Sequence, residues 1–407
     1  MSEEPADVLA AAAYLSRVAE PASVPLYLLV SELGYVAAAE AVLAGEVSSE
    51  LREATEARRL SVEAEADLEA ADRNDIRLIT PASGEWPHFA LAPLYVSAAR
   101  RCAEWTRGNR ARPNSGELIP PLALWLRGTG NLRDVGLTSL AIVGSRAATS
   151  YGQQVAAELA HGLAARDVVV VSGGAYGIDA VAHRGALSAD GATVLVSAGG
   201  LDRPYPAGHD LLYARTAEVG VLVSERPPGS APHRQRFLSR NRLIAAFGSA
   251  TLVVEAARRS GALNSARYAR DLGRPVLAVP GPITSAMSGG CHALIQREEA
   301  PAFLVTGLQD VLPFCTPLGS AGDSGGQEPC PAQPAGTTGA AARDGLDDSA
   351  KAVLDGFPAR GFVTEADLAR LSGRPIQQVL AALPSLTQLG LIRSGPRGHQ
   401  RVQGVAS

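Results

Sequence analysis

Residues 168–183 read Val-Val-Val-Val-Ser-Gly-Gly-Ala-Tyr-Gly-Ile-Asp-Ala-Val-Ala-His, a short apolar run that leads through a glycine-rich loop into a helix-length segment. A run of four β-branched residues predicts a buried strand. The glycines let the backbone turn sharply and approach a neighbouring group closely. A single loop of this kind is more often only a tight turn, so its meaning depends on whether the pattern returns elsewhere.

The pattern returns several times between residues 139 and 312. Apolar runs occupy 140–143, 168–171, 193–197, 220–223, 251–254 and 275–279, and helix-length segments separate them. The runs are apolar throughout rather than alternating, which indicates that both faces of the sheet are covered. We therefore predict an α/β fold with a doubly wound, mostly parallel sheet and right-handed crossovers.

Polar loops follow these runs, and in an open parallel sheet ligands bind at the carboxyl ends of the strands. Glycine amides can hold an anion, the forked donors of arginine suit phosphate, and asparagine can bond to bases or sugar. We expect Arg146, Arg240 and Arg242 to point into one cationic groove. The candidate residues are Gly144, Ser145, Arg146, Ser172, Gly173, Gly174, Arg240, Asn241, Arg242, Ser260, Gly261, Asn264 and Gly281.

Charge is unevenly distributed along the chain, although the formal net charge is only −4. Residues 1–75 contain 16 Asp and Glu against five Arg, a net charge of −11. Residues 226–274 contain ten Arg against two acidic residues, a net charge of +8. Such a basic stretch is what a polyanion-binding surface requires, although a solvated helix face would give the same count.

Several classes of function are excluded by what the sequence lacks. Lys351, the only lysine, is followed by Ala352, so there is no Walker A loop, and neither Gly-x-Ser-x-Gly nor His-Glu-x-x-His occurs. The four scattered cysteines form no Cys-x-x-Cys pair, which fits a reducing compartment. With an acidic N-terminus and no bilayer-length apolar run, we expect a cytoplasmic protein without membrane segments. We expect no catalytic residue, metal or cofactor.

Four polar residues near the strand ends have structural interpretations that we prefer to catalytic ones. His183 is expected to pack or orient, and Asp179 to complement the positive end of the helix that follows the second loop. Glu225 and Glu255 end neighbouring runs and are expected to pair with local arginines. Because residues 173–177 do not form Gly-x-Gly-x-x-Gly, a nicotinamide site is poorly supported.

Composition divides the rest of the chain into further segments. Residues 1–75 carry apolar positions at helical spacing and predict a helical domain. Residues 76–138 are irregular, with one strand-like run at 122–126, and lead into the sheet domain at 139–312. Residues 313–344, rich in Gly, Pro and Ser, predict a flexible linker. Residues 345–407 have the helix, turn, helix and hairpin order of a winged-helix domain.

The ordered series of motifs resembles the DNA-processing protein A family (DprA, also called Smf). The family pattern is matched at 144–146, 151–152, 172–183, 200–206, 224–225, 240–242, 254–256, 260–266 and 280–281, with Ser265 in place of a threonine. Similarity upstream is weaker, and residues 95–116 look like an insertion.

The resemblance implies an extended Rossmann-like fold that binds single-stranded DNA rather than a nucleotide cofactor. It also implies a homodimer that loads a RecA-type recombinase onto incoming DNA in natural transformation, with a sterile-alpha-motif-like domain before the sheet and a winged-helix domain after it. Family members often place Lys in the DNA pocket, and here Arg236 or Arg267 is the candidate to replace it. Tyr176, Tyr205 and Phe237 are the loop aromatics that could stack on bases.

Two other functions stay open. Related Rossmann-like families cleave nucleoside monophosphates, but residues 260–265 lack the Gly-Gly-x-Gly-Thr segment that such an enzyme would need. A purely structural scaffold would leave the polar loops without a purpose. In the C-terminal segment, the candidate recognition helix at 375–389 carries no Arg or Lys. We therefore expect a partner-binding or weakly DNA-assisting module there, and not a reader of duplex sequence.

Overall fold

The computed structural model describes residues 4–60, 63–108, 118–133, 135–315, 348–358, 362–375, 378–379, 382–383, 386, 391–395 and 398–401. The chain divides into two compact units, Met1–Gly322 and Asp323–Ser407. Each unit has its own core of buried apolar side chains.

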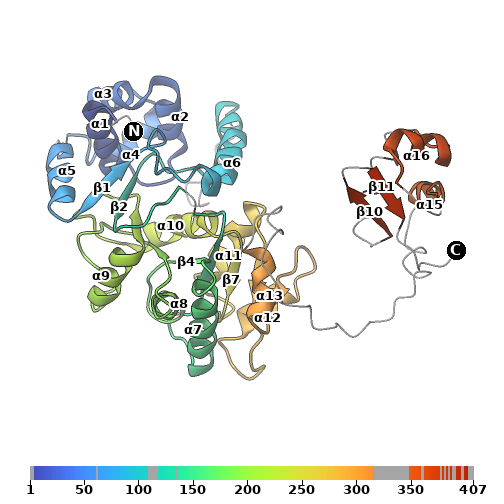
Figure 1. The fold of residues 1–407 in the computed structure, drawn as a ribbon. Coiled ribbons are helices and arrows are strands. Elements are labelled where there is room, and N and C mark those ends of the chain that lie inside the picture. The colour runs from blue at the N-terminus through green and yellow to red at the C-terminus, as the bar shows by residue number, and fades with distance from the viewer. Residues whose placement is uncertain are drawn as a thin grey trace. The chain divides into compact units, whose positions relative to one another are not determined.

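The first unit is built around a nine-stranded sheet with the order β1-β2-β6-β5-β4-β3-β7-β8-β9 (Figure 1). All neighbours from β6 to β9 pair in parallel, whereas β2 is antiparallel to both β1 and β6. The chain starts the parallel part at the central β3 and winds outward in both directions. The strands are β1 Ile76–Ile79, β2 Leu124–Arg127, β3 Ser139–Val143, β4 Val169–Ser172, β5 Thr193–Val196, β6 Val221–Ser224, β7 Thr251–Val253, β8 Val276–Ala278 and β9 Phe303–Leu304.

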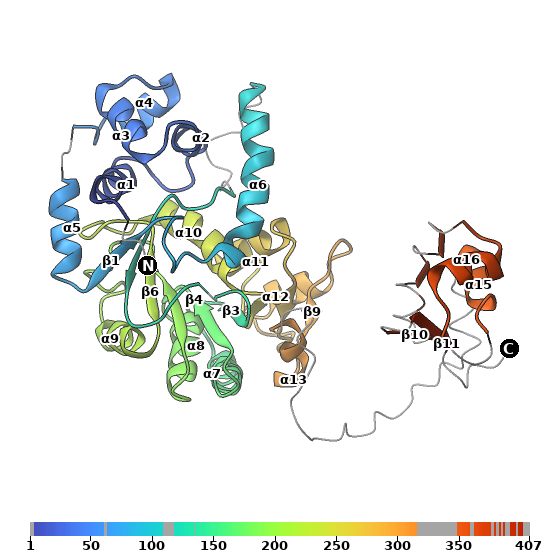
Figure 2. The same ribbon diagram turned by 45° about the horizontal axis from the view of Figure 1, so that its top comes forward.

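Helices cover both faces of this sheet (Figure 1, Figure 2). Leu140 and Ile142 of β3 pack with residues of α7 and α8. Ala141 and Val143 of the same strand pack with residues of α10 and α11. Since neighbouring residues of a strand point to opposite faces, a strand covered on both sides must be apolar at every position. These helices are α7 Ser150–Ala164, α8 Ile178–Leu187, α9 Asp210–Val219, α10 Arg234–Phe247, α11 Ala262–Asp271, α12 Gly289–Ile295 and α13 Leu308–Val311, followed by a 3₁₀ turn at Leu312–Phe314.

The predicted fold class is confirmed, and β3 to β8 begin and end within one residue of the predicted runs. Strands β1 and β9 were not predicted. Both are short strands at the edges of the sheet. A short edge segment carries too few residues to show a clear periodicity.

Residues 6–72 form five helices, in agreement with the helical interpretation of this region: α1 Ala6–Val18, α2 Val24–Leu33, α3 Tyr35–Ala44, α4 Ser49–Thr55 and α5 Ala64–Asp72. They belong to the same compact unit as the sheet. Ala13 of α1 shares an apolar cluster with Trp125 of β2 and Leu201. The N-terminal helices thus pack directly on the antiparallel edge of the sheet (Figure 2).

The interpretation of residues 76–138 as irregular is wrong in one part, because α6 runs through His88–Thr106. Pro93 lies inside this helix, and its presence hid the apolar face formed by Ala90, Leu91, Leu94 and Ala98. Residues 109–116, the rest of the expected insertion, lie outside the described residues. Among the described residues, no helix combines the length and the hydropathy that a membrane span requires.

The second unit contains α15 Asp348–Asp355, α16 Glu365–Ser372, β10 Ile392–Gly395 and β11 Gly398–Arg401. Thr364 caps α16, since its hydroxyl accepts a hydrogen bond from the Asp367 amide at 3.3 Å. The predicted hairpin is also present, with β10 antiparallel to β11. Most of the expected recognition helix and the linker from residue 316 onward lie outside the described residues, so the winged-helix assignment stays a prediction.

Candidate nucleic-acid interface

A pocket of about 660 Å³ opens at the carboxyl ends of the parallel strands. Loops that follow β3, β4, β5, β6 and β7 all contribute to it, together with the start of α10. Half of the predicted residues line the pocket. They are Gly144, Ser145, Arg146, Arg240, Asn241, Ser260 and Gly261.

The loops after β3 and β4 are packed tightly against each other, and their glycines permit this contact. The Ile178 amide donates to the Ser145 carbonyl at 3.1 Å. A Cβ on Gly177, whose φ is +80°, would lie 2.2 Å from that carbonyl oxygen, and a Cβ on Gly144 would lie 2.5 Å from Ile178. Gly144, which we expected to face a ligand, thus also brings the two loops together, and Gly177 does the same from the other loop.

Glu255 fixes the other side of the loop after β3. Its carboxylate accepts hydrogen bonds from the Thr149 amide at 2.9 Å and the Thr149 hydroxyl at 2.6 Å. Its own carbonyl accepts one from the Ser145 amide at 2.7 Å. The expected pairing of Glu255 with an arginine is therefore wrong. The corresponding expectation for Glu225 is confirmed, because Arg242 lies 2.6 Å from its carboxylate.

Three exposed arginines surround the mouth of the pocket: Arg146, Arg234 and Arg259. Within the part of the chain that the structure describes, none of them makes an ion pair with a carboxylate. Exposed guanidinium groups without acidic partners can each donate forked hydrogen bonds to a phosphate.

Arg240 lies beneath these residues and is only 6% exposed. Its Nη1 donates to the carbonyl of Gly173 at 2.8 Å and also to that of Val196. Burial, opposed by the nearby Asp179, lowers the pKa of Arg240 to about 10, so the side chain stays charged at neutral pH. It contributes fixed positive charge to the floor of the pocket.

An aromatic pair stands beside these cations. The rings of Tyr205 and Phe237 are 5.4 Å apart, and both residues line the pocket. The guanidinium carbon of Arg146 lies 5.2 Å from the Phe237 ring centre, and that of Arg240 lies 5.9 Å from it. Cations and ring faces at one place form the kind of surface on which unpaired bases stack.

Two further titratable groups lie close to these cations: Asp179 is a lining residue of the pocket, whereas His183 lies beneath it. Burial raises the pKa of Asp179 to about 6, against the opposing effects of Arg240 and the backbone amides of Ala175 and Gly144. His183 is fully buried, with Nδ1 2.7 Å from the Thr193 hydroxyl, and burial lowers its pKa to about 3. His183 therefore stays neutral and packs in the interior, as we expected.

The segment Ser172–Gly174 supports the pocket from below and does not line it. The Ser172 hydroxyl donates to the Ile142 carbonyl at 2.6 Å. The Gly173 carbonyl accepts from Arg240, and the Gly174 carbonyl lies 3.1 Å from Nδ1 of His209. These carbonyl contacts hold the loop in place, so its contribution to binding is indirect.

Arg236 and Arg242 do not point into the pocket, which corrects the expectation that Arg242 joins Arg146 and Arg240 in one groove. Arg242 is completely buried and donates to the Ile119 carbonyl at 2.9 Å as well as to Glu225. Arg236 is 8% exposed and pairs with Glu20. Successive residues of a helix point about 100° apart. Four arginines on α10 therefore cannot all face one side.

Asn264 and Gly281 also lie outside the pocket lining. The Asn264 amide donates to the Leu238 carbonyl at 3.4 Å and accepts from Arg267 at 2.9 Å. The Gly281 carbonyl lies 3.0 Å from Nε2 of His292. Arg267, one of the two candidates to replace a pocket lysine, is 3.7 Å from Asp271 and does not line the pocket either.

Sequence reasoning missed Arg234 and Arg259 as pocket residues. Both were counted in the basic stretch, and Arg259 directly precedes the predicted Ser260 and Gly261. For Arg259, the sequence did contain a signal: this residue lies next to a polar loop at the end of a strand. No local signal separates Arg234 from Arg236, because their difference lies in which partner each one meets. Among the described residues, no group of three or more His, Cys, Asp or Glu is arranged to hold a metal ion.

The family model of DNA recombination-mediator protein A matches residues 115–316, a span that contains the whole pocket. A DNA processing protein DprA of Mycobacterium tuberculosis is 49% identical over 379 residues, which cover 93% of this chain and 90% of that relative. The chain belongs to the DNA-processing protein A family. The resemblance drawn from the motifs is therefore confirmed.

Other DprA proteins agree in sequence and in fold. DprA of Streptococcus pneumoniae is 40% identical over 183 residues, which cover 45% of this chain and 64% of that relative. The crystal structure of DprA from Streptococcus pneumoniae superposes with a TM-score of 0.56 at 28% identity, covering 76% of this chain and 98% of that chain. The DprA fold thus includes the strand ends at which the pocket lies.

Proposed function

We propose that this DprA family member binds single-stranded DNA in the pocket at the carboxyl ends of its sheet and acts in homologous recombination. The observation that carries the proposal is the contrast among its arginines. Arg146, Arg234 and Arg259 are exposed and have no carboxylate partner among the described residues, whereas the buried Arg236 and Arg242 each pair with an acidic side chain. Free guanidinium groups around a pocket suit a chain of phosphates.

The DNA backbone would contact the exposed arginines and the loops at Ser145 and Ser260, while Phe237 and Tyr205 offer ring faces to unpaired bases. Phosphate contacts give affinity that does not depend on sequence, and base–aromatic stacking favours single strands over duplex. Arg240 and Asn241 would act from the floor and wall of the pocket.

Membership of the family supports a proposal that goes beyond DNA binding. We propose that the protein acts without catalysis, as a cytoplasmic homodimer that delivers DNA to a RecA-type recombinase, and that the C-terminal unit is a winged-helix module for a partner. The alternative, an enzyme that cleaves nucleotides, is not favoured. Glu255 is 2% exposed, its carboxylate accepts a hydrogen bond from Thr149, and it does not line the pocket.

Replacing Arg146 with Ala tests the DNA site. We expect affinity for a labelled oligothymidylate to fall about tenfold or more, since a hydrogen bond to a charged group contributes about 1.5–3 kcal/mol. The slope of log affinity against log salt should also become shallower by about 0.7, the value for one lost phosphate contact on a single strand. Fluorescence anisotropy at about 50 and about 200 mM salt measures both quantities.

Arg166→Ala is the matched control. Arg166 is an exposed arginine just after the C-terminal end of α7, where it donates to the Gly162 carbonyl. Equal loss in the two variants, or equal affinity of the wild type for duplex and single strands, would overturn the proposed function.

A further inference from the structure

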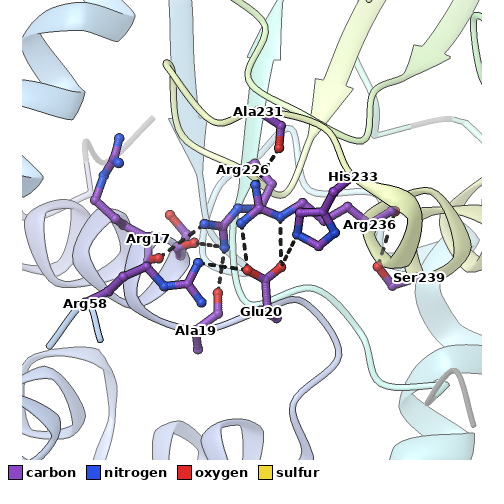
Figure 3. Close-up of polar contacts among 10 residues, drawn as sticks. Arg17, Ala19, Glu20, Arg58, Arg226, Ala231, His233, Arg236 and Ser239 are labelled. Atoms are coloured by element: carbon purple, nitrogen blue, oxygen red, sulfur yellow. Dashed lines mark hydrogen bonds and ion pairs between the residues drawn. The ribbon is translucent and has the colours of Figure 1, made fainter. Parts of the chain in front are cut away.

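The N-terminal helices meet segment 231–238, which contributes several residues to the pocket lining, at a cluster of charged side chains (Figure 3). Arg226, just after β6, is only 3% exposed. Its guanidinium donates to carbonyls at the end of α1: Ser16 at 2.5 Å, Ala19 at 2.6 Å and Arg17 at 3.2 Å. A buried cation thus joins the end of α1 to the sheet.

Glu20 is the acidic centre of this cluster. Its two carboxylate oxygens accept hydrogen bonds from Nε and Nη2 of Arg236 at 2.8 and 2.6 Å, which is a bidentate pair. Arg58 donates to the same carboxylate at 2.8 Å, and Nε2 of His233 lies 3.8 Å away. Burial would raise the pKa of Glu20, but bonds from Arg236 and Arg58 and the charge of Arg226 lower it to about 2.

Arg236 carries this contact to the pocket. Its Nη1 donates to the Ala231 carbonyl at 2.7 Å, so one guanidinium holds both Glu20 and the loop before α10. The pocket residues His233, Arg234 and Phe237 lie within three positions of Arg236 along the chain. Because the planar guanidinium of Arg236 is hydrogen-bonded to Glu20 and to the Ala231 carbonyl, it restrains the first turn of α10.

We propose that Glu20, on the N-terminal helical layer, is a positioning residue for single-stranded DNA: by holding Arg236 it sets the place of Arg234 and Phe237 in the pocket. The inference rests on the proposed function and goes beyond it, because Glu20 lies outside residues 115–316 that the family model matches. It also assigns the N-terminal helices a part in the DNA site.

The sign of the effect separates positioning from simple electrostatics. Glu20 is a negative charge near a cationic pocket, so removing it would strengthen DNA binding if charge alone mattered. If Glu20 positions the segment, removing it leaves Arg236 unpaired and frees the start of α10, which weakens binding. The same substitution therefore has opposite expected outcomes under the two explanations.

The test measures oligothymidylate binding by Glu20→Gln and Arg236→Lys in the full chain, singly and together. We expect each single variant to lose about three- to tenfold in affinity. The double variant should lose no more than the larger single loss, because the two residues act through one contact. Thermal unfolding of each variant establishes that it is folded at the assay temperature.

Glu63→Gln is the matched control, since Glu63 belongs to the same junction, pairs with Arg17 at 3.3 Å and has a side chain 56% exposed. It removes one negative charge without touching segment 231–238. Unchanged or stronger binding by folded Glu20→Gln overturns the inference, as does an equal loss in Glu63→Gln. If Glu20→Gln does not fold, unchanged binding by Arg236→Lys overturns it. Absence of binding by the wild type, or no loss in Arg146→Ala, instead overturns the proposed function.

Discussion

Neighbouring side chains, and not residue type, decide what each arginine of this protein does. Four arginines of α10 have three different surroundings. Arg234 is exposed to solvent at the pocket, and Arg240 supports the pocket floor through backbone carbonyls. Arg236 and Arg242 pair with carboxylates from other parts of the chain. A buried charge that loses its partner is strongly destabilising, whereas an exposed one contributes little to stability. The structural and binding arginines should therefore separate in experiments.

Arg242→Ala is expected to destabilise the fold by about 3–5 kcal/mol, because it leaves the carboxylate of Glu225, whose side chain is only 10% exposed, without its partner. Arg259→Ala should change stability by less than about 0.5 kcal/mol, as surface substitutions do, and should lower affinity for single-stranded DNA. Urea unfolding and anisotropy titrations on both variants measure the two quantities. Little loss of stability in Arg242→Ala would contradict this division.

Asp179 predicts a pH dependence of stability. Its pKa is about 6 in the folded protein, raised by burial from 3.8, so the folded state binds the proton more tightly than the unfolded state. Stability from this proton is fully present below pH 3.8 and is lost as the pH rises through 6. Relative to Asp179→Asn, the wild type should gain up to about 3 kcal/mol on acidification from pH 7, at about 1.4 kcal/mol per pKa unit. Urea unfolding at several pH values measures the difference, and a constant difference would contradict the prediction.

At the scale of elements, the pocket is made by loops that support one another. The loop after β3 is held by the loop after β4 on one side and by Glu255 on the other. Glycines at the contact let the two backbones approach, so a methyl group there would push Ser145 and Arg146 out of place. The arginines can come together at the pocket only if these loops pack correctly.

Gly177→Ala tests this packing. A positive φ and a Cβ 2.2 Å from the Ser145 carbonyl oxygen should together destabilise the protein by roughly 2–5 kcal/mol and weaken DNA binding. Gly273→Ala is the control, because its φ of +71° is also positive but nothing lies within 4 Å of the added Cβ. It should lower stability by only about 1–2 kcal/mol and leave binding unchanged. Thermal melts and titrations compare them, and equal behaviour would show that the clash does not matter.

At the scale of the whole molecule, the acidic N-terminal part and the basic centre are adjacent in space as well as opposite in charge. Glu20 neutralises Arg236 and Arg58, and Asp67 pairs with Arg17. Of these three arginines only Arg236 belongs to the basic stretch 226–274, so the Glu20–Arg236 pair is the one that joins the two parts and neutralises charge of that stretch. The second compact unit contributes no described residue to the pocket.

A chain that ends at Cys315 should therefore unfold with an unchanged midpoint and bind single-stranded DNA within about threefold of the full chain, a difference of ~0.6 kcal/mol. The described residues that form the main cores of the first unit and the pocket all lie before this point in the chain. Circular dichroism melts and anisotropy titrations compare the two proteins. A larger loss of affinity would show that the C-terminal unit takes part in binding.

Local patterns along the chain were enough to predict strands β3 to β8, the mostly parallel sheet and the family. Buried strands and glycine-rich loops each leave such a pattern. Half of the residues that the sequence predicted for the site do line the pocket, since strand ends in a parallel sheet meet at one edge. Strands β1 and β9 and helix α6 left no such pattern.

Which arginines are free of carboxylate partners became clear only from the folded structure. Glu20 and Arg236 are 216 residues apart in the chain, and Glu225 and Arg242 come from different elements. Nothing local in the sequence distinguishes a paired arginine from an unpaired one, because the free energy of a charged side chain depends on its partners and its burial. Those are fixed only when distant segments pack together.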